Sequence, residues 1–208
     1  MSVFYRILFP ITTFSCISPG TYLHFFWNHF IIKKDFYGPN KSEYDKGLVI
    51  SMTEFRKIED SKVETVHIIR PNHLNGAGRL FGGMLMQWMD EVAGIVSFRH
   101  AQCNCTTASV DNLRFIRGAY QNELVAIIGK VTYTGRTSLE VRVDSYVEDR
   151  NGIRRPINRA FFTMVALDEN DRPRPVPQIE IITEEQKAEW EGAIKRRAMR
   201  EQRHTEGF

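Results

Sequence analysis

The sequence predicts an α+β protein in which an antiparallel sheet of about five strands wraps around one long helix. Residues 84–100 form an apolar segment without proline, which is typical of a helix packed into a domain core. Strand-like segments follow this helix at short intervals. Turn residues such as Asn151-Gly152 separate these segments, and such turns favour antiparallel neighbours.

The first elements have clear local signals. Residues 63–69 are rich in valine, threonine and isoleucine and end at Arg70-Pro71, where proline disfavours helix, so we expect a strand. The helix at 84–100 should span about 27 Å at 1.5 Å per residue, enough to cross a small domain. Because it is apolar around most of its circumference, we expect it to be buried.

Four further strands are expected at residues 106–115, 123–133, 138–149 and 156–167. In the third, apolar side chains alternate with charged ones, which predicts a sheet with one covered face. Residues 183–186 form a capping box, which opens a polar helix that runs to about Gln202. Its basic residues lie toward the far end: Lys195, Arg196, Arg197 and Arg200.

Length and composition limit the classes of function. A chain of 208 residues is expected to form one domain, either alone or with an appendage. The net charge of +3 comes from 28 basic and 25 acidic residues, a balance that excludes nucleic acid as the main partner. Three cysteines cannot form a disulfide framework and fit a reducing compartment, so we expect a cytoplasmic protein.

Residues 1–51 differ in composition from the rest of the chain. Twelve of the 24 aromatic residues lie between Phe4 and Tyr44. The most apolar stretch, residues 17–32, is interrupted by Pro19 and polar residues and falls short of the ~20 apolar residues that a membrane-spanning helix needs. We therefore expect no membrane span, secretory signal or transit peptide. Residues 1–51 are interpreted as an N-terminal extension or, alternatively, as lying outside a native protein that starts at Met52.

The most informative segment is rich in glycine and leads into the predicted helix. It reads PNHLNGAGRLFGGM at residues 71–84 and is followed by WMDEVA at 88–93. Further blocks read TASVD at 107–111, GRTS at 135–138 and VALD at 165–168. In this order and spacing they resemble the hotdog-fold acyl-CoA thioesterases, specifically the broad-range bacterial acyl-CoA hydrolases related to the mammalian cytosolic enzymes. The resemblance covers about residues 63–200.

The resemblance implies a hotdog domain at residues 52–182, followed by a basic helix and tail at 183–208. It also implies a fatty acyl-CoA hydrolase that needs no cofactor. Such proteins form homodimers with sites at the subunit interface, and the dimers often assemble into hexamers. Two alternatives stay open: a hotdog dehydratase or hydratase that acts on acyl thioesters, and a non-catalytic acyl-CoA-binding module.

Asp90 is the leading candidate for the catalytic carboxylate. It falls in the middle of an apolar helix, where an unpaired buried carboxylate is costly, so we expect it to be paired or to open onto a cavity. The resemblance makes it a general base or a nucleophile. A purely structural role, such as a bridge within a dimer, is the alternative reading.

Asn75, Gly82 and Gly83 are the candidates for binding the thioester. The resemblance implies that Asn75 positions water or polarises the thioester, although an asparagine in a turn also bonds its own backbone. Gly82 and Gly83 precede the helix, where free N–H groups can hold an oxyanion, although close packing also favours glycine there. Asp90 lies seven residues beyond Gly83, about 10 Å along the helix. We therefore expect Asp90 to come from a second subunit.

The candidates for binding coenzyme A are basic or hydroxyl side chains. Arg136, Thr137 and Ser138, in a turn at the sheet end, suit phosphate or pantetheine. Arg117 and the Arg196-Arg197 pair are weaker candidates.

No metal site is expected, because His100, Cys103 and Cys105 offer three ligands without an obvious fourth. His73 is the loop histidine that a dehydratase would use, but Asn75 and Asp90 fit the hydrolase better.

Overall fold

The computed structural model describes residues 54–207. The elements in chain order are β1 (Phe55–Lys57), η1 (Ile58–Asp60), β2 (Val63–Ile68), η2 (Pro71–His73), α1 (Gly82–Ala101), β3 (Cys105–Phe115), β4 (Leu124–Thr134), β5 (Ser138–Glu148), β6 (Arg154–Ala166), β7 (Gln178–Glu180) and α2 (Glu184–Glu206). The expectation for residues 1–51 lies outside the described residues, as does Cys16.

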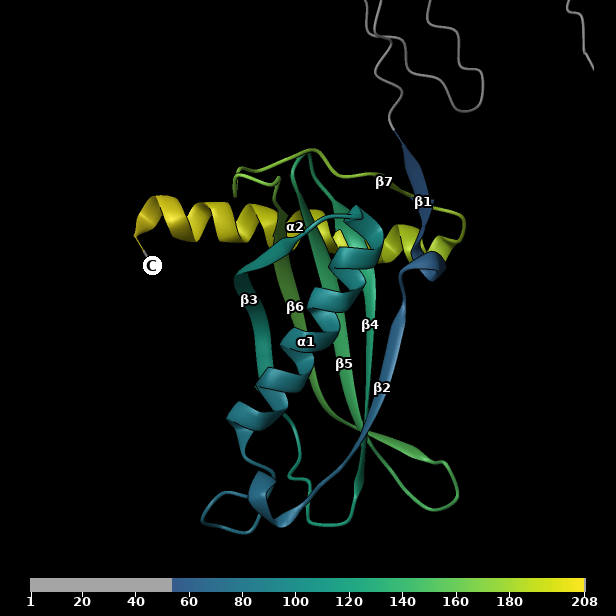
Figure 1. Cartoon of the computed structure of the whole chain (residues 1–208), viewed down its shortest axis with the longest axis vertical. Helices are drawn as coiled ribbons and strands as arrows, with labels where there is room; N and C mark the ends of the chain where they lie inside the picture. Colours follow the sequence, from purple (N-terminus) through teal and green to yellow (C-terminus); the bar gives the residue numbers. More distant parts are fainter. Residues whose placement is uncertain (1–53, 208) are drawn as a thin grey trace, which may run out of the picture. The chain divides into compact units, whose positions relative to one another are not determined.

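The main sheet within the described residues has five strands in the order β2-β4-β5-β6-β3, and all neighbours are antiparallel. α1 runs along one face of this sheet, and α2 crosses the opposite face (Figure 1). The α+β arrangement predicted from the sequence is confirmed, and each predicted strand agrees with an observed one to within about two residues. Within residues 54–207, neither helix is both long and apolar enough to cross a lipid bilayer.

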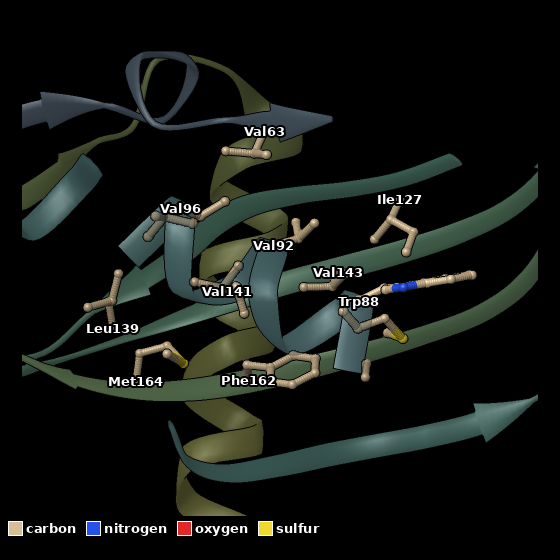
Figure 2. Close-up of a cluster of buried hydrophobic side chains, with 14 of the residues drawn as sticks. Val63, Trp88, Val92, Val96, Ile127, Leu139, Val141, Val143, Phe162 and Met164 are labelled. Atoms are coloured by element: carbon tan, nitrogen blue, oxygen red, sulfur yellow. The ribbon is translucent and has the colours of Figure 1, made fainter. Parts of the chain in front are cut away.

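The core lies between α1 and the sheet. Figure 2 shows Val92 and Val96 of α1 among apolar side chains of the sheet such as Val141, and all three are buried. The helix comes very close to β4 at Gly129, where a Cβ atom would lie 2.6 Å from Val92 and 3.0 Å from Val96. The absence of a side chain at Gly129 therefore sets how closely α1 packs on the sheet.

We expect Gly129→Ala to lower the free energy of unfolding by about 1–3 kcal/mol, because the added methyl group overpacks the contact between helix and sheet. Gly76→Ala is the matched control, since a Cβ at Gly76 meets nothing within 4 Å. Urea denaturation of both variants and the parent measures the difference. Equal midpoints for the two variants would contradict the close approach at Gly129.

The expectation that α1 is buried is wrong for one of its faces in the single chain. Met86, Ile95 and Phe98 are 40%, 40% and 57% exposed. The physical reason is that the sheet covers only one side of the helix, whereas the apolar residues extend around more of its circumference.

The prediction of a sheet with one covered face is also wrong, because α2 covers part of the charged face. Glu140, which is 2% exposed, accepts hydrogen bonds from Thr132 and from Arg196 of α2, each at 2.7 Å. The Arg196 guanidinium also lies 3.6 Å from the centroid of the Phe161 ring. Charged side chains therefore attach α2 to the sheet. Because the strand residues in this contact are charged, their alternation with apolar residues resembles that of a solvent-exposed face, and the contact with α2 was not predicted.

The sequence did not predict β1 and β7, which pair in parallel and are three residues long each. The buried His100 joins this end of the fold to α1: its Nε2–H donates to the Pro177 carbonyl at 3.2 Å, and its Nδ1 accepts from the Ser61 hydroxyl at 3.3 Å. Desolvation on burial lowers the pKa of His100 below 6.5, and the hydrogen bond to Pro177 opposes this shift only in part.

We expect stability to fall as the pH drops below about 6.5, because the unfolded chain then binds a proton at His100 that the folded chain does not. His100→Gln keeps a side-chain N–H donor and does not titrate, so its stability should fall less steeply over the same range. Denaturant titrations between pH 7 and pH 5 measure both slopes. Identical slopes would show that the folded state accepts the proton without cost.

Candidate active site

The loop that precedes α1 fixes the side chain of Asn75. Its Oδ1 accepts hydrogen bonds from the backbone N–H groups of Ala77 at 2.9 Å and Arg79 at 3.2 Å. The backbone N–H of Asn75 donates to the Arg79 carbonyl at 2.8 Å. The loop interpretation of Asn75 is therefore confirmed for its oxygen, while no hydrogen bond occupies Nδ2 within the described residues. Anchoring the oxygen fixes the direction in which the two amide hydrogens point.

The N-terminus of α1 is open because no side chain caps it. Its N-cap residue, Phe81, makes no side-chain cap hydrogen bond. A Cβ atom at Gly83 would lie 2.5 Å from the Phe81 ring, and one at Gly82 would lie 3.1 Å from the Phe115 ring. Any larger residue at either position would have to displace one of these two rings, and the absence of side chains leaves the backbone N–H groups of both glycines approachable.

Asp90 is exposed in the single chain and is paired with a hydroxyl group. Its Oδ1 accepts a hydrogen bond of 2.6 Å from Thr107 Oγ1, and Thr107 lies on β3, the last strand in the sheet order. The expectation that Asp90 has a partner is confirmed. Thr107 was not predicted as a site residue, although it begins the block at 107–111, because nothing in the spacing showed that β3 lies beside the middle of α1.

A cleft of about 380 Å³ opens beside the N-terminus of α1. It brings together three predicted site residues, Asn75, Gly82 and Arg117, and adds Arg79, which was not predicted as a site residue. Its other lining residues are Leu80, Leu85, Phe115, Ile116, Gly118, Ala119 and Ile157. Asp90 does not line this cleft, so one chain does not assemble the complete predicted site.

Arg136, Thr137 and Ser138 lie at the opposite end of α1 from the cleft. Their turn joins β4 to β5, and the Arg136 carbonyl accepts a hydrogen bond of 3.0 Å from Val176, close to β7. α1 has 20 residues and is about 30 Å long. Within one chain, the Arg136 turn and Asn75 are therefore separated by roughly the length of this helix.

The other basic candidates have structural partners. Arg196 binds Glu140, and Arg197 binds Glu201 at 2.8 Å and the Tyr133 hydroxyl at 2.9 Å. The arginine-rich hairpin between β5 and β6 is also largely neutralised by carboxylates. The pairs are Arg154 with Glu64 and Glu148, Arg155 with Asp149, and Arg159 with Asp144. These arginines hold elements of the fold together.

The three potential metal ligands do not converge. Both ring nitrogens of His100 are engaged by Ser61 and Pro177. Cys103 and Cys105 are free thiols, and burial raises the pKa of Cys105 to about 12. Across residues 54–207, no group of three or more His, Cys, Asp or Glu side chains is arranged to hold a metal ion.

One long helix on a five-stranded antiparallel sheet, with a glycine-rich loop at the helix N-terminus, defines a hotdog-fold protein. Residues 77–153 match the model of the thioesterase superfamily. A protein of Bacillus subtilis described as an uncharacterized acyl-CoA thioester hydrolase is 35% identical over 151 residues, which are 72% of this chain and 88% of that protein. The chain belongs to the thioesterase superfamily.

A mammalian relative is longer than this chain. The cytosolic acyl coenzyme A thioester hydrolase of Mus musculus is 36% identical over 152 residues, which are 70% of this chain. The matched region is 40% of the mouse protein, so the chain spans about two fifths of the length of this relative.

Solved structures agree with the fold. A hexameric acyl-CoA thioesterase without ligand superposes with a TM-score of 0.70 and 36% identity, and the match covers 73% of this chain and 97% of that one. The acyl-CoA hydrolase of Staphylococcus aureus, in complex with butyryl coenzyme A and coenzyme A, gives a TM-score of 0.70 at 28% identity, covering 74% and 94%. In three further structures of the S. aureus protein, an asparagine, an aspartate or a threonine is replaced by alanine. In the S. aureus protein, the aspartate lies 15 residues after the asparagine, and the threonine lies 17 residues after the aspartate.

Proposed function

We propose that this protein is an acyl-CoA thioesterase that hydrolyses fatty acyl-CoA to free fatty acid and coenzyme A. The observation that carries the proposal is the set Asn75, Asp90 and Thr107. These residues are also separated by 15 and 17 positions, as are the three residues that were replaced in the S. aureus acyl-CoA hydrolase. The hydrogen bond between Asp90 and Thr107 supports a shared role for these two residues.

Asn75 and Gly83 act on the thioester carbonyl. Because Oδ1 of Asn75 is held by its own loop, Nδ2 donates to the carbonyl oxygen or to the attacking water. The backbone N–H of Gly83, at the positive end of the α1 dipole, donates to the oxyanion as the carbonyl becomes tetrahedral. Both donors are fixed before substrate binds, so little reorganisation is needed during the reaction.

Asp90 supplies the negative charge that drives attack. As a general base it takes a proton from water, and as a nucleophile its carboxylate attacks the carbonyl directly. In either role, Thr107 donates to Oδ1 and leaves Oδ2 to face the substrate, so Thr107 is a positioning residue. The coenzyme A thiolate leaves when the tetrahedral intermediate collapses.

The complete site requires two subunits. Within one chain Asp90 lies about 10 Å along α1 from Gly83, too far for both to reach one carbonyl. The exposed apolar face of α1 and the edge strand β3 offer a surface on which a second copy can pack. A two-fold dimer then builds two sites, each with Asn75 and Gly83 from one subunit and Asp90 and Thr107 from the other. The hexameric relative supports assembly into trimers of such dimers.

The same division of the site residues between two subunits also brings Arg136 close to a site. Asp90 lies eleven residues from Ala101, about 16 Å along α1, and the turn that carries Arg136, Thr137 and Ser138 lies at that end of the helix. The subunit that contributes Asp90 therefore also offers these groups to the phosphates or the pantetheine of coenzyme A. Arg117 lies on the Asn75 side, with Gly82 beside it.

The geometry favours hydrolysis over dehydration. His73 would have to act on substrate in a dehydratase, but its ring packs edge-on against Trp88 with centroids 5.1 Å apart. Its Nδ1 accepts a hydrogen bond of 3.2 Å from the Arg70 backbone. These contacts hold the imidazole as part of the η2 turn.

The experiment that tests the proposal follows thiol release from acyl-CoA with a thiol reagent. Steady release, proportional to the concentration of protein, supports hydrolysis. Dehydration of a 3-hydroxyacyl thioester without thiol release would establish the alternative enzyme. Tight binding of acyl-CoA with neither reaction would establish a binding module.

A further inference from the structure

The cleft beside Asn75 has apolar walls and two cationic side chains. Its lining includes Arg79 and Arg117, and none of its lining residues within the described chain is an aspartate or a glutamate. Neither guanidinium forms an ion pair with any residue in the range 54–207. By contrast, eight arginines on β5, β6 and α2 are paired with carboxylates in the same structure. They are Arg142, Arg154, Arg155, Arg159, Arg196, Arg197, Arg200 and Arg203.

The backbone of Arg79 is fixed relative to the proposed catalytic loop. Its N–H donates to Asn75 Oδ1, its carbonyl accepts from the Asn75 N–H, and it forms a β-bridge with Tyr120. Its aliphatic stem lies over Gly118, where a Cβ atom would come within 3.3 Å of Arg79 Cδ. The charge of Arg79 is therefore attached to the same short loop that orients the amide of Asn75.

Arg117 enters the cleft from the segment that follows β3. The preceding residue, Ile116, is held by a hydrogen bond of 2.9 Å from its N–H to the Ile157 carbonyl on β6. The uncapped N-terminus of α1 at Gly82 adds a positive partial charge to the same cleft. Two unpaired guanidinium groups and this partial charge give the cleft a positive potential, with apolar surface around it.

We propose that Arg79 and Arg117 form a binding subsite for an oxyanion group of the substrate. The inference rests on the proposed function and specifies the chemistry of the substrate. Two parts of an acyl-CoA can supply the oxyanion: a phosphate of coenzyme A, or a carboxylate at the far end of the acyl chain. The apolar walls accommodate the apolar parts of the chain that joins the anion to the thioester in either case.

Three thioesters test the subsite. They are hexanoyl-CoA, hexanoyl-pantetheine, which lacks the phosphates together with the adenosine, and adipoyl-CoA, which adds a terminal carboxylate. KM and kcat are measured for the full-length protein and for Arg79→Gln and Arg117→Gln. Each substitution should raise KM about tenfold or more for the substrate whose anion is bound, with little change in kcat, because a charge-assisted hydrogen bond is lost.

The pattern across substrates identifies the source of the anion. Weaker binding of hexanoyl-CoA and adipoyl-CoA, but not of hexanoyl-pantetheine, assigns the subsite to a phosphate. Weaker binding of adipoyl-CoA alone assigns it to an acyl carboxylate. Equal changes for all three, or no change, would overturn the subsite. Arg150→Gln is the matched control, since Arg150 is exposed, unpaired within residues 54–207 and located in the β5–β6 turn.

The test separates this inference from the proposed function. If the parent protein releases no thiol from any of the three, the hydrolase proposal fails. Calorimetric titration of the same thioesters then gives the comparison as Kd values, and the same patterns support or overturn the anion subsite.

Discussion

Replacing Asp90 by asparagine is expected to reduce kcat about a thousandfold, because the amide can neither accept the proton of water nor attack the thioester. The substitution is nearly isosteric, and Asp90 is exposed in the single chain, so the fold should be retained. Thiol release from acyl-CoA measures kcat, and thermal unfolding monitors the fold. Loss of less than about tenfold would assign Asp90 a structural role.

Thr107 provides a graded control for this result. Thr107→Val removes the hydroxyl that donates to Asp90 Oδ1 and should lower kcat by a smaller factor than Asp90→Asn, with little effect on KM. Thr107→Ser keeps the hydroxyl and should restore most of the activity. If valine and serine behave alike, the hydrogen bond does not position the carboxylate.

Replacing Asn75 by alanine is expected to reduce kcat about a hundredfold, because one donor to the developing oxyanion is lost. The change also removes the acceptor for the Ala77 and Arg79 N–H groups, so part of the effect comes from the loop. Asn75→Asp is the matched variant, since it keeps the acceptor for both backbone groups, removes the amide donor and adds a negative charge. Full activity of Asn75→Asp would contradict the role of Nδ2.

The sequence was sufficient to predict the fold where periodicity and turn residues act locally. The long helix, the strands after it and the capping box at Thr183 all follow from neighbouring residues, and the structure confirms them. Asn122, in the turn before β4, adopts the left-handed conformation at φ 66°, which asparagine tolerates better than most residues. Local chemistry determines these features, so a single sequence contains enough information to predict them.

Contacts between distant segments could not be predicted in this way. Glu140 and Arg196 are 56 residues apart and meet only because α2 folds back across the sheet. Thr107 reaches Asp90 only because β3 lies at the edge of the sheet beside α1. Arg79 lines the cleft only because its loop pairs with the chain segment at Tyr120. The sequence predicted the types of group in the site, and the tertiary fold determines which of them meet.

The composite site across two subunits is the central claim, and activity in mixed assemblies tests it most directly. Asp90→Asn and Asn75→Ala chains, each nearly inactive alone, are unfolded together, refolded and assayed for thiol release. In a mixed dimer, one of the two sites receives Asn75 from one chain and Asp90 from the other, so activity should recover to roughly a quarter of that of the parent protein after random mixing. Mixed assemblies that form but stay as inactive as the separate variants would contradict a site shared between subunits.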